Sequence, residues 1–160
     1  MTETATTIQM TGALEPRDGW TADRCPMAHA LDVVRNRSAF LVLREAFYGA
    51  TRFEEFVART ELSEPVASAR LRELTDAGLL EREPYREPGQ RTRHAYRLTE
   101  MGADLLPALV ALMQWGDKWV LPGGARVEIR HEGCGAAVSA ELRCAHGHAV
   151  GGGELELARR

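Results

Sequence analysis

Cysteine is scarce in this sequence, with three residues, Cys25, Cys134 and Cys144, among 160. So small and odd a number is not typical of a secreted disulfide scaffold, and it leaves at least one thiol free or bound to a metal. The chain also lacks an apolar run approaching the roughly 18 residues of a membrane span. Its N-terminus has no basic start followed by an apolar block. We therefore expect a cytoplasmic protein with no membrane partner.

An excess of positive charge is also absent. The formal net charge is -3, from 20 basic and 23 acidic side chains. This balance argues against a histone-like nucleic-acid binder that depends on global counterion release, but local basic patches remain open. With 44% hydrophobic residues, the chain can bury one core, which favours a single compact domain with a small appendage.

The known signatures of catalysis are missing too. The sequence contains no Walker loop, GxSxG, HExxH or dinucleotide-binding glycine pattern. The neighbouring acids Glu54 and Glu55 point to different faces of one predicted helix, so they do not form a catalytic pair. We expect no enzyme and no required cofactor, with a zinc- or thiol-dependent enzyme as a distant alternative.

What the sequence does contain is a series of short segments with helical apolar spacing. They cover residues 25–36, 39–49, 52–60 and 64–77. Ser38 and Ser63 are placed to cap the second and the fourth helix. Val66, Leu71 and Leu74 are expected to point inward from the fourth. The last two helices, joined by "TELS", form a helix-turn-helix pattern.

A β-hairpin is predicted directly after these helices. The strands are residues 79–85 and 94–99, and the polar stretch "REPGQRTR" between them suits a hairpin loop. From residue 86 to residue 97 the local charge is +3, because Glu87 is the single acid among four arginines: Arg86, Arg91, Arg93 and Arg97. The basic charge of the chain is therefore concentrated in this hairpin.

A long helix with a wide apolar face is predicted for residues 100–119, and a face of this kind needs a partner. Pro107 can bend this helix near its start, and Pro122 ends it. The predicted domains are a disordered or extended arm (1–23), a winged helix-turn-helix (24–121), a small hairpin appendage (122–150) and a flexible tail (151–160). The fold class is mainly α with a small β-hairpin wing (α+β).

A winged helix-turn-helix places the helix after the turn in the major groove, and its wing contacts phosphates or the minor groove. The predicted recognition-helix residues are Ser63, Glu64, Ser68, Arg70 and Arg72, and the basic wing residues are Arg86, Arg91 and Arg93. Arginine suits both tasks, because its planar fork pairs with guanine or with phosphate. Alternatively these arginines are solvated surface, paired with Glu73, Asp76 or Glu81.

Residues 25–119 resemble the HxlR-type transcriptional regulators, relatives of the MarR group. The motifs that carry the resemblance are "CPMAHALDVV", "LREAFYGATRFEEF", "LSEPVASARLRELTDAGLLERE", "HAYRLTEMGADLLPAL" and "ALMQWGDKW". The resemblance implies a homodimer that binds palindromic operators, with terminal helices packed across the two-fold axis. It also places Ser63, Ser68, Arg70 and Arg72 on the recognition helix, and Arg91, Arg93 and His94 on or beside the wing.

The chain departs from the family pattern at two places. "NRSAF" stands where the family commonly has a Gly-Lys-Trp run, and Pro65 stands where a basic residue is frequent. The operator sequence is therefore not transferable. We expect a DNA-binding regulator, more readily a repressor than an activator. The competing hypotheses are a winged-helix protein-interaction module without DNA binding and a regulator that responds to thiol or zinc chemistry.

Cys25 matches a cysteine that precedes a proline near the N-terminus of the family. In some members this cysteine senses oxidants or electrophiles, and a helix N-terminus stabilises a thiolate. Cys25 is therefore a candidate sensor for an oxidant or small-molecule effector. The alternative is a small buried apolar residue in a dimer contact.

The C-terminal stretch "HEGCGAAVSAELRCAHGH" is rich in side-chain types that bind metals. They are His131, Cys134, Cys144, His146 and His148. Two such groups on a hairpin could form a tetrahedral zinc site, and some family members carry a CxxC-like knuckle at this place. In this chain Gly147 stands where the last cysteine of the knuckle is expected. A degenerate hairpin with solvent-facing histidines is the favoured alternative.

Overall fold

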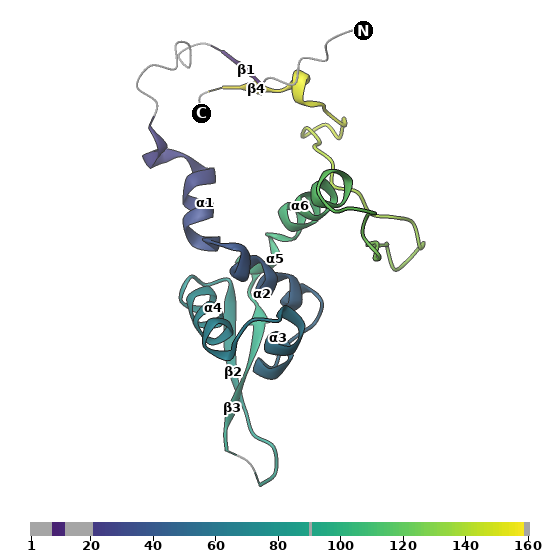
Figure 1. Ribbon diagram of the computed structural model, residues 1–160. Coiled ribbons are helices and arrows are strands. Elements are labelled where there is room, and N and C mark those ends of the chain that lie inside the picture. Colours follow the sequence, from purple (N-terminus) through teal and green to yellow (C-terminus); the bar gives the residue numbers. More distant parts are fainter. Residues whose placement is uncertain (1–7, 12–20, 90, 159–160) are drawn as a thin grey trace. The chain divides into compact units, whose positions relative to one another are not determined.

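The computed structural model describes residues 8–11, 21–89 and 91–158 (Figure 1). It divides into two compact units. One runs from Asp23 to Met113, and the other combines the described residues up to Ala22 with those from Gln114 onward. Most of the predicted N-terminal arm, residues 1–7 and 12–20, lies outside the described residues, as do Gln90 in the wing and the last two residues.

The unit from Asp23 to Met113 has its elements in winged-helix order. They are α1 (Pro26–Val34), α2 (Arg37–Phe47), α3 (Phe53–Thr60), α4 (Glu64–Asp76), β2 (Leu80–Tyr85), β3 (Arg93–Leu98), α5 (Glu100–Ala103) and the first part of α6 (Leu106–Trp119), preceded by the 3-10 turn η2 (Ala22–Arg24). Helices dominate, and the one hairpin is antiparallel. This arrangement confirms the predicted α+β winged helix-turn-helix.

The start of α2 differs from the prediction. Asn36, not Ser38, is the capping residue, and its side-chain oxygen accepts a 3.1 Å hydrogen bond from the backbone N–H of Ala39. The Ser38 hydroxyl donates to the same oxygen at 2.6 Å. Asparagine is as good an N-cap as serine, so the helix begins at the earlier of the two residues.

Helix α3 is defined at both of its ends. The Glu55 carboxylate accepts hydrogen bonds from the backbone N–H groups of Arg52 (3.0 Å) and Thr51 (2.9 Å), and these bonds lower its pKa from the ordinary 4.5. After α3, Glu61 adopts a left-handed conformation with φ 57°. Ser63 precedes α4, as predicted, but its side chain makes no capping hydrogen bond.

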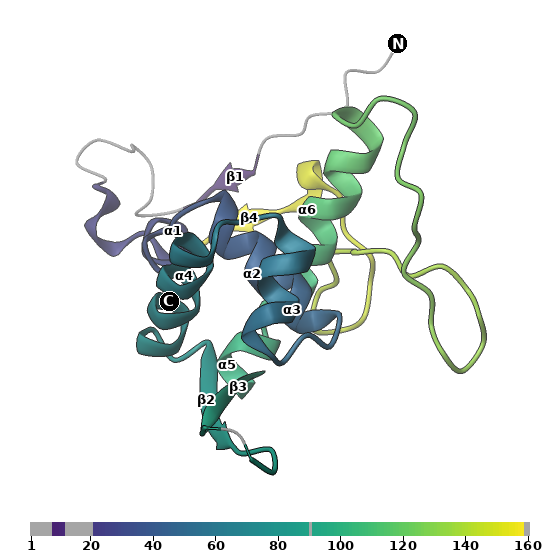
Figure 2. The ribbon, with the colours of Figure 1, turned by 60° about the horizontal axis from the view of Figure 1, so that its bottom comes forward.

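The core lies between the helices and the base of the hairpin. α2 packs against both α3 and α4 and lies between them in Figure 2. Leu71 and Leu74 are fully buried, as predicted, but Val66 is 39% exposed and Ala67 is buried in its place. Positions 67, 71 and 74 lie on one helical stripe, from which position 66 is displaced by about 100°.

The hairpin is fixed to the helices through Tyr96. In the β2–β3 register Arg82 pairs with Tyr96 and Pro84 pairs with His94. The Tyr96 ring packs edge-on against the core residue Phe56, with centroids 6.1 Å apart. Its backbone N–H donates a 2.7 Å hydrogen bond to the carbonyl of Thr51. The wing is therefore attached to the start of α3, and its tip projects beyond the helices (Figure 1).

The single helix predicted from residue 100 is in fact two helices, α5 and α6. Pro107 has no backbone N–H and its ring clashes with the carbonyl four residues earlier, so the helix is interrupted before it. Thr99 caps α5, because its hydroxyl oxygen accepts from the N–H of Gly102 at 3.1 Å. A Cβ at Gly102 would overlap the carbonyl oxygen of Leu79, so glycine permits this close approach.

The second unit contains little regular structure. Residues Gln9–Met10 (β1) pair in parallel with Glu156–Leu157 (β4), after the short 3-10 helix η3 (Gly152–Glu154). The predicted flexible tail thus contains a strand and a helical turn. One hairpin is predicted for residues 122–150, but the structure has two successive turns, closed by the single bridges Arg130–Ala137 and Arg143–Ala149.

None of the described helices is both long and apolar enough to cross a bilayer.

Candidate nucleic-acid interface

The outer face of α4 exposes four of the five predicted recognition residues: Ser63, Glu64, Ser68 and Arg72. Arg70 is different. Its side chain is 20% exposed and forms a 2.6 Å ion pair with Glu73 on the same helix. Its Nε is buried and has no hydrogen-bond partner among the described residues. Arg70 is therefore turned toward its own helix, and Arg72 is the arginine that α4 presents.

A hollow of about 400 Å³ lies between α4 and the hairpin. Its lining residues are Ser68, Arg72, Thr75, Asp76, Arg82 and Tyr96. Arg82 is exposed and comes from strand β2. The sequence reasoning missed Arg82, because it stands between Glu81 and Glu83 and reads as part of a balanced charge pattern. Strand alternation was the available signal, since it places Arg82 on the opposite face from both acids.

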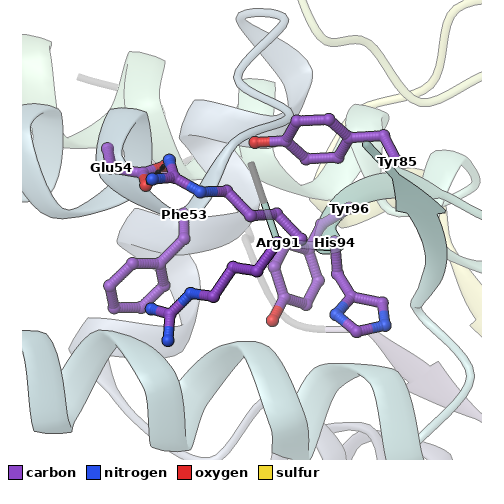
Figure 3. A pocket seen from close by; sticks show the side chains of 7 residues that line it. Phe53, Glu54, Tyr85, Arg91, His94 and Tyr96 are labelled. Carbon is purple, nitrogen blue, oxygen red and sulfur yellow. Dashed lines mark hydrogen bonds and ion pairs between the residues drawn. The ribbon is translucent and has the colours of Figure 1, made fainter. Parts of the chain in front are cut away.

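A second hollow of about 230 Å³ is lined by residues of the wing and of the start of α3 (Figure 3). Its lining residues are Phe53, Glu54, Tyr85, Arg91, Arg93, His94 and Tyr96. The structure therefore brings three of the four predicted wing residues together around aromatic rings. Tyr96 lines both hollows, so α4, the hairpin and the start of α3 share one surface.

Acidic partners neutralise part of the basic wing. Arg93 pairs with Glu54 at 2.7 Å. Arg97 pairs with Glu83, also at 2.7 Å. Glu87 accepts an ion pair from Arg52 outside the wing at 3.0 Å, and Arg52 also lies over the Tyr85 ring, 5.2 Å from its centroid. Arg86 interacts with a neighbour as well.

Three arginines on this surface differ from the others. Arg72, Arg82 and Arg91 form no ion pair with any residue in the described ranges. All three are exposed, and they come from the recognition helix, the first strand of the hairpin and the wing. The uncompensated positive charge of the surface is therefore spread over all three of these elements.

Cys25 occupies the N-cap position of α1, with Pro26 following in the first turn. The residue is half-buried and forms no disulfide. The structure thus places the thiol at a helix N-terminus, as the sequence predicts.

The metal-capable residues of the C-terminal unit lie in its two turns. In the first turn His131 Nδ1 is 3.2 Å from Cys134 Sγ. In the second, the rings of His146 and His148 are 6.4 Å apart between centroids. Within the described ranges no three His, Cys, Asp or Glu side chains are grouped so that they could hold a metal ion. The zinc site stays a prediction, and this arrangement gives it no support.

Comparison with known proteins places the chain among helix-turn-helix regulators. An uncharacterised HTH-type transcriptional regulator of Mycobacterium tuberculosis, Rv3095, is 42% identical over 121 residues, which cover 75% of each chain. The crystal structure of PA1607, described as a candidate transcription factor, matches with a TM-score of 0.76 at 31% identity, covering 86% of this chain and 96% of that one. The redox regulator HypR in its oxidised form matches with a TM-score of 0.54 at 28% identity, covering 59% of this chain and 96% of that one.

The model of the HxlR-like helix-turn-helix family matches residues 33–123. This range contains α2 to α6 and the hairpin, and therefore both hollows of the surface described above. Since the match spans more than half of the sequence, this protein belongs to the HxlR-like helix-turn-helix family.

Proposed function

We propose that the protein is a transcriptional regulator that binds double-stranded DNA in a sequence-specific manner. The observation that carries this proposal is the set of three arginines without acidic partners in the described residues, Arg72, Arg82 and Arg91, on a chain whose net charge is -3. An acidic protein that gathers unneutralised cations on one winged-helix surface has the local electrostatics that DNA requires. Membership of the HxlR-like family and relatives named as transcriptional regulators support the same function.

In this proposal α4 enters the major groove and the hairpin lies along the backbone. The N-terminal half of α4, with Ser63, Glu64 and Ser68 exposed, faces base edges. Arg91 and His94 hold the wing against phosphates, with Arg86 and Arg93 beside them. Binding occludes a promoter, so we propose repression by steric occupation. The relatives are named as regulators rather than enzymes, and we propose no catalytic activity.

We propose that the binding unit is a homodimer on a palindromic operator. Helix α6 carries exposed apolar side chains at helical spacing, with Leu112 52%, Trp115 58% and Trp119 67% exposed. Residues 112, 115 and 119 fall on one stripe, and a stripe of this kind on a helix is a packing surface. A second copy of the chain would cover it, and two-fold symmetry of the protein matches a two-fold operator.

We also propose that the regulator responds to oxidants through Cys25. The half-buried thiol occupies the N-cap position of α1, directly before Pro26. HypR, a redox regulator, has a similar fold. A modification rate for Cys25 faster than that of a model thiol is expected. A rate no faster than the model thiol's would remove the oxidant response from the proposal and leave DNA binding intact.

The experiment that tests the proposed function is selection from genomic duplex fragments with purified reduced protein, followed by footprinting of the enriched sites. A palindrome protected in two equal halves is the expected outcome. If no fragment is enriched at low salt, the winged helix is a protein-interaction module and the DNA-binding proposal is wrong.

A further inference from the structure

The hollow between α4 and the hairpin contains two cations from different elements. Arg72 comes from the helix and Arg82 from strand β2, and both line the same space of about 400 Å³. Neither forms an ion pair within the described part of the chain, although Asp76 lines the same hollow. Two arginines that line one space and form no ion pair there attract an anion.

The other lining residues suit a tetrahedral oxyanion better than a planar apolar ligand. Ser68 and Tyr96, whose side chains carry hydroxyl groups, line the hollow, whereas the Thr75 hydroxyl is already engaged as a donor to the Leu71 carbonyl at 2.7 Å. Arg82 is cross-strand from Tyr96 on a paired strand, so its position is fixed by the ladder. Guanidinium forks and hydroxyl donors are the side chains that most often contact phosphate oxygens.

We propose that this hollow is a phosphate site in which Arg72 and Arg82 grip one phosphate group together, and that the group is a backbone phosphate of DNA. The proposal rests on the proposed function and deepens it. It adds Arg82 to the interface and assigns Arg72 to phosphate contact rather than to base reading. Because one phosphate is held from both the helix and the strand, the clamp fixes the angle at which α4 lies in the groove.

The hollow is also lined by an acidic residue, Asp76. In the proposal its negative charge repels a phosphate held by the two arginines. Replacement by asparagine removes this repulsion and keeps the size of the side chain. Asp76→Asn is therefore expected to bind DNA more tightly than wild type, which a purely structural role of Asp76 would not produce.

The DNA test compares Arg72→Ala, Arg82→Ala and the double variant by fluorescence anisotropy across salt concentrations. Arg97→Ala is the matched control, because Arg97 lies on the same hairpin but on the opposite face, paired with Glu83 at 2.7 Å. Each clamp variant is expected to lose roughly tenfold in affinity for all sequences, the control about twofold or less. All four arginine variants should unfold at the wild-type temperature, because these side chains are exposed.

The double variant decides whether one phosphate or two are involved. If both arginines hold the same phosphate, the double variant loses little more than either single variant. The negative slope of log K against log salt for the double variant should then be shallower than that of wild type by about 0.9 per protomer. If the loss of affinity in the double variant instead equals the product of the two single losses, and the salt slope becomes shallower by about 1.8, the two arginines contact different phosphates. This result would overturn the shared phosphate site but not DNA binding.

A second measurement tests phosphate binding in the hollow independently of DNA. The side-chain Nε–H resonances of Arg72 and Arg82 are followed by NMR while inorganic phosphate is added at constant ionic strength, with chloride as the comparison. The clamp predicts that both resonances shift together with one apparent affinity. If inorganic phosphate shifts both resonances but the protein binds no DNA, the hollow binds a free phosphate group and the DNA-binding proposal is wrong. No shift with either phosphate or DNA would overturn the site itself.

Discussion

Arg93 in the wing and Glu54 at the start of α3 both line the smaller hollow and form a 2.7 Å ion pair. Both side chains remain about half exposed, so the pair is accessible to solvent and to a competing anion. A DNA phosphate that approaches the wing therefore competes with Glu54 for this arginine. The wing of the free protein is less basic than its sequence indicates, and Arg91 forms no ion pair with the residues that the structure describes.

Glu54→Gln is expected to raise DNA affinity two- to fivefold, because it releases Arg93 for phosphate contact. The range corresponds to the modest strength of an exposed ion pair. Anisotropy titration at low salt measures the effect. The control is Asp104→Asn, because Asp104 is an exposed acid at the end of α5. This variant measures the effect of losing one negative charge elsewhere on the protein. Equal gains in both variants would show that no specific release occurs.

Arg70→Ala is expected to lower the stability of the fold rather than DNA affinity. Its side chain is largely covered and paired with Glu73 at 2.6 Å, so truncation removes packing along α4 and leaves Glu73 without its partner. The cost is roughly 1 kcal/mol of unfolding free energy. Urea unfolding and DNA titration of the same preparation separate the two effects. A loss of affinity equal to that of Arg72→Ala, with unchanged stability, would contradict this assignment.

Glu55 gives the fold a defined dependence on pH. Its pKa is lowered from 4.5 by hydrogen bonds from the backbone N–H groups of Arg52 and Thr51. A lowered pKa means that the stabilisation is present above pH 4.5 and is lost as pH falls through the pKa of the folded state. Urea unfolding of wild type between about pH 5 and pH 3 should show this loss, and Glu55→Gln should lack that part of it. Parallel pH curves for the two proteins would be the contrary result.

Leu112→Arg is expected to convert the proposed dimer to a monomer, because it places a charge on the exposed apolar stripe of α6. Light scattering coupled to size exclusion measures the mass directly. Ala103→Arg is the control, since Ala103 is exposed on α5 and lies outside the stripe. A mass that stays unchanged in Leu112→Arg, or that falls equally in the control, would argue for another interface.

Local signals were sufficient to predict most of the winged helix. The segments that became α1, α3, α4 and the hairpin have clear apolar periods and end at turn residues such as Gly78. The sequence predicts a bend at Pro107, whereas the structure has a break between α5 and α6. A proline is tolerated in the first turn of a helix, so the sequence alone does not show whether the preceding turn continues into that helix. The pairing of Gln9–Met10 with Glu156–Leu157 joins two segments that are far apart in the sequence, which no local pattern indicates.

The candidate site was predictable only in part. Residue types and spacing identified Arg72 and Arg91, but whether an arginine is neutralised depends on acids brought close by folding. Arg70 and Arg93 acquire such partners, at 2.6 and 2.7 Å, and Arg72 and Arg91 do not within the described residues. Arg82 was hidden by its acidic neighbours in the sequence, and the strand register places it in the hollow with Arg72.

The most direct measurement is the affinity of the purified protein for a selected duplex and for a scrambled duplex of the same composition, titrated by anisotropy across salt concentrations. A sequence-specific regulator should bind the selected duplex at least a thousandfold more tightly, with log K falling steeply as salt rises for both. Equal and weak binding of the two duplexes at every salt concentration would contradict a DNA-reading role for α4 and the wing.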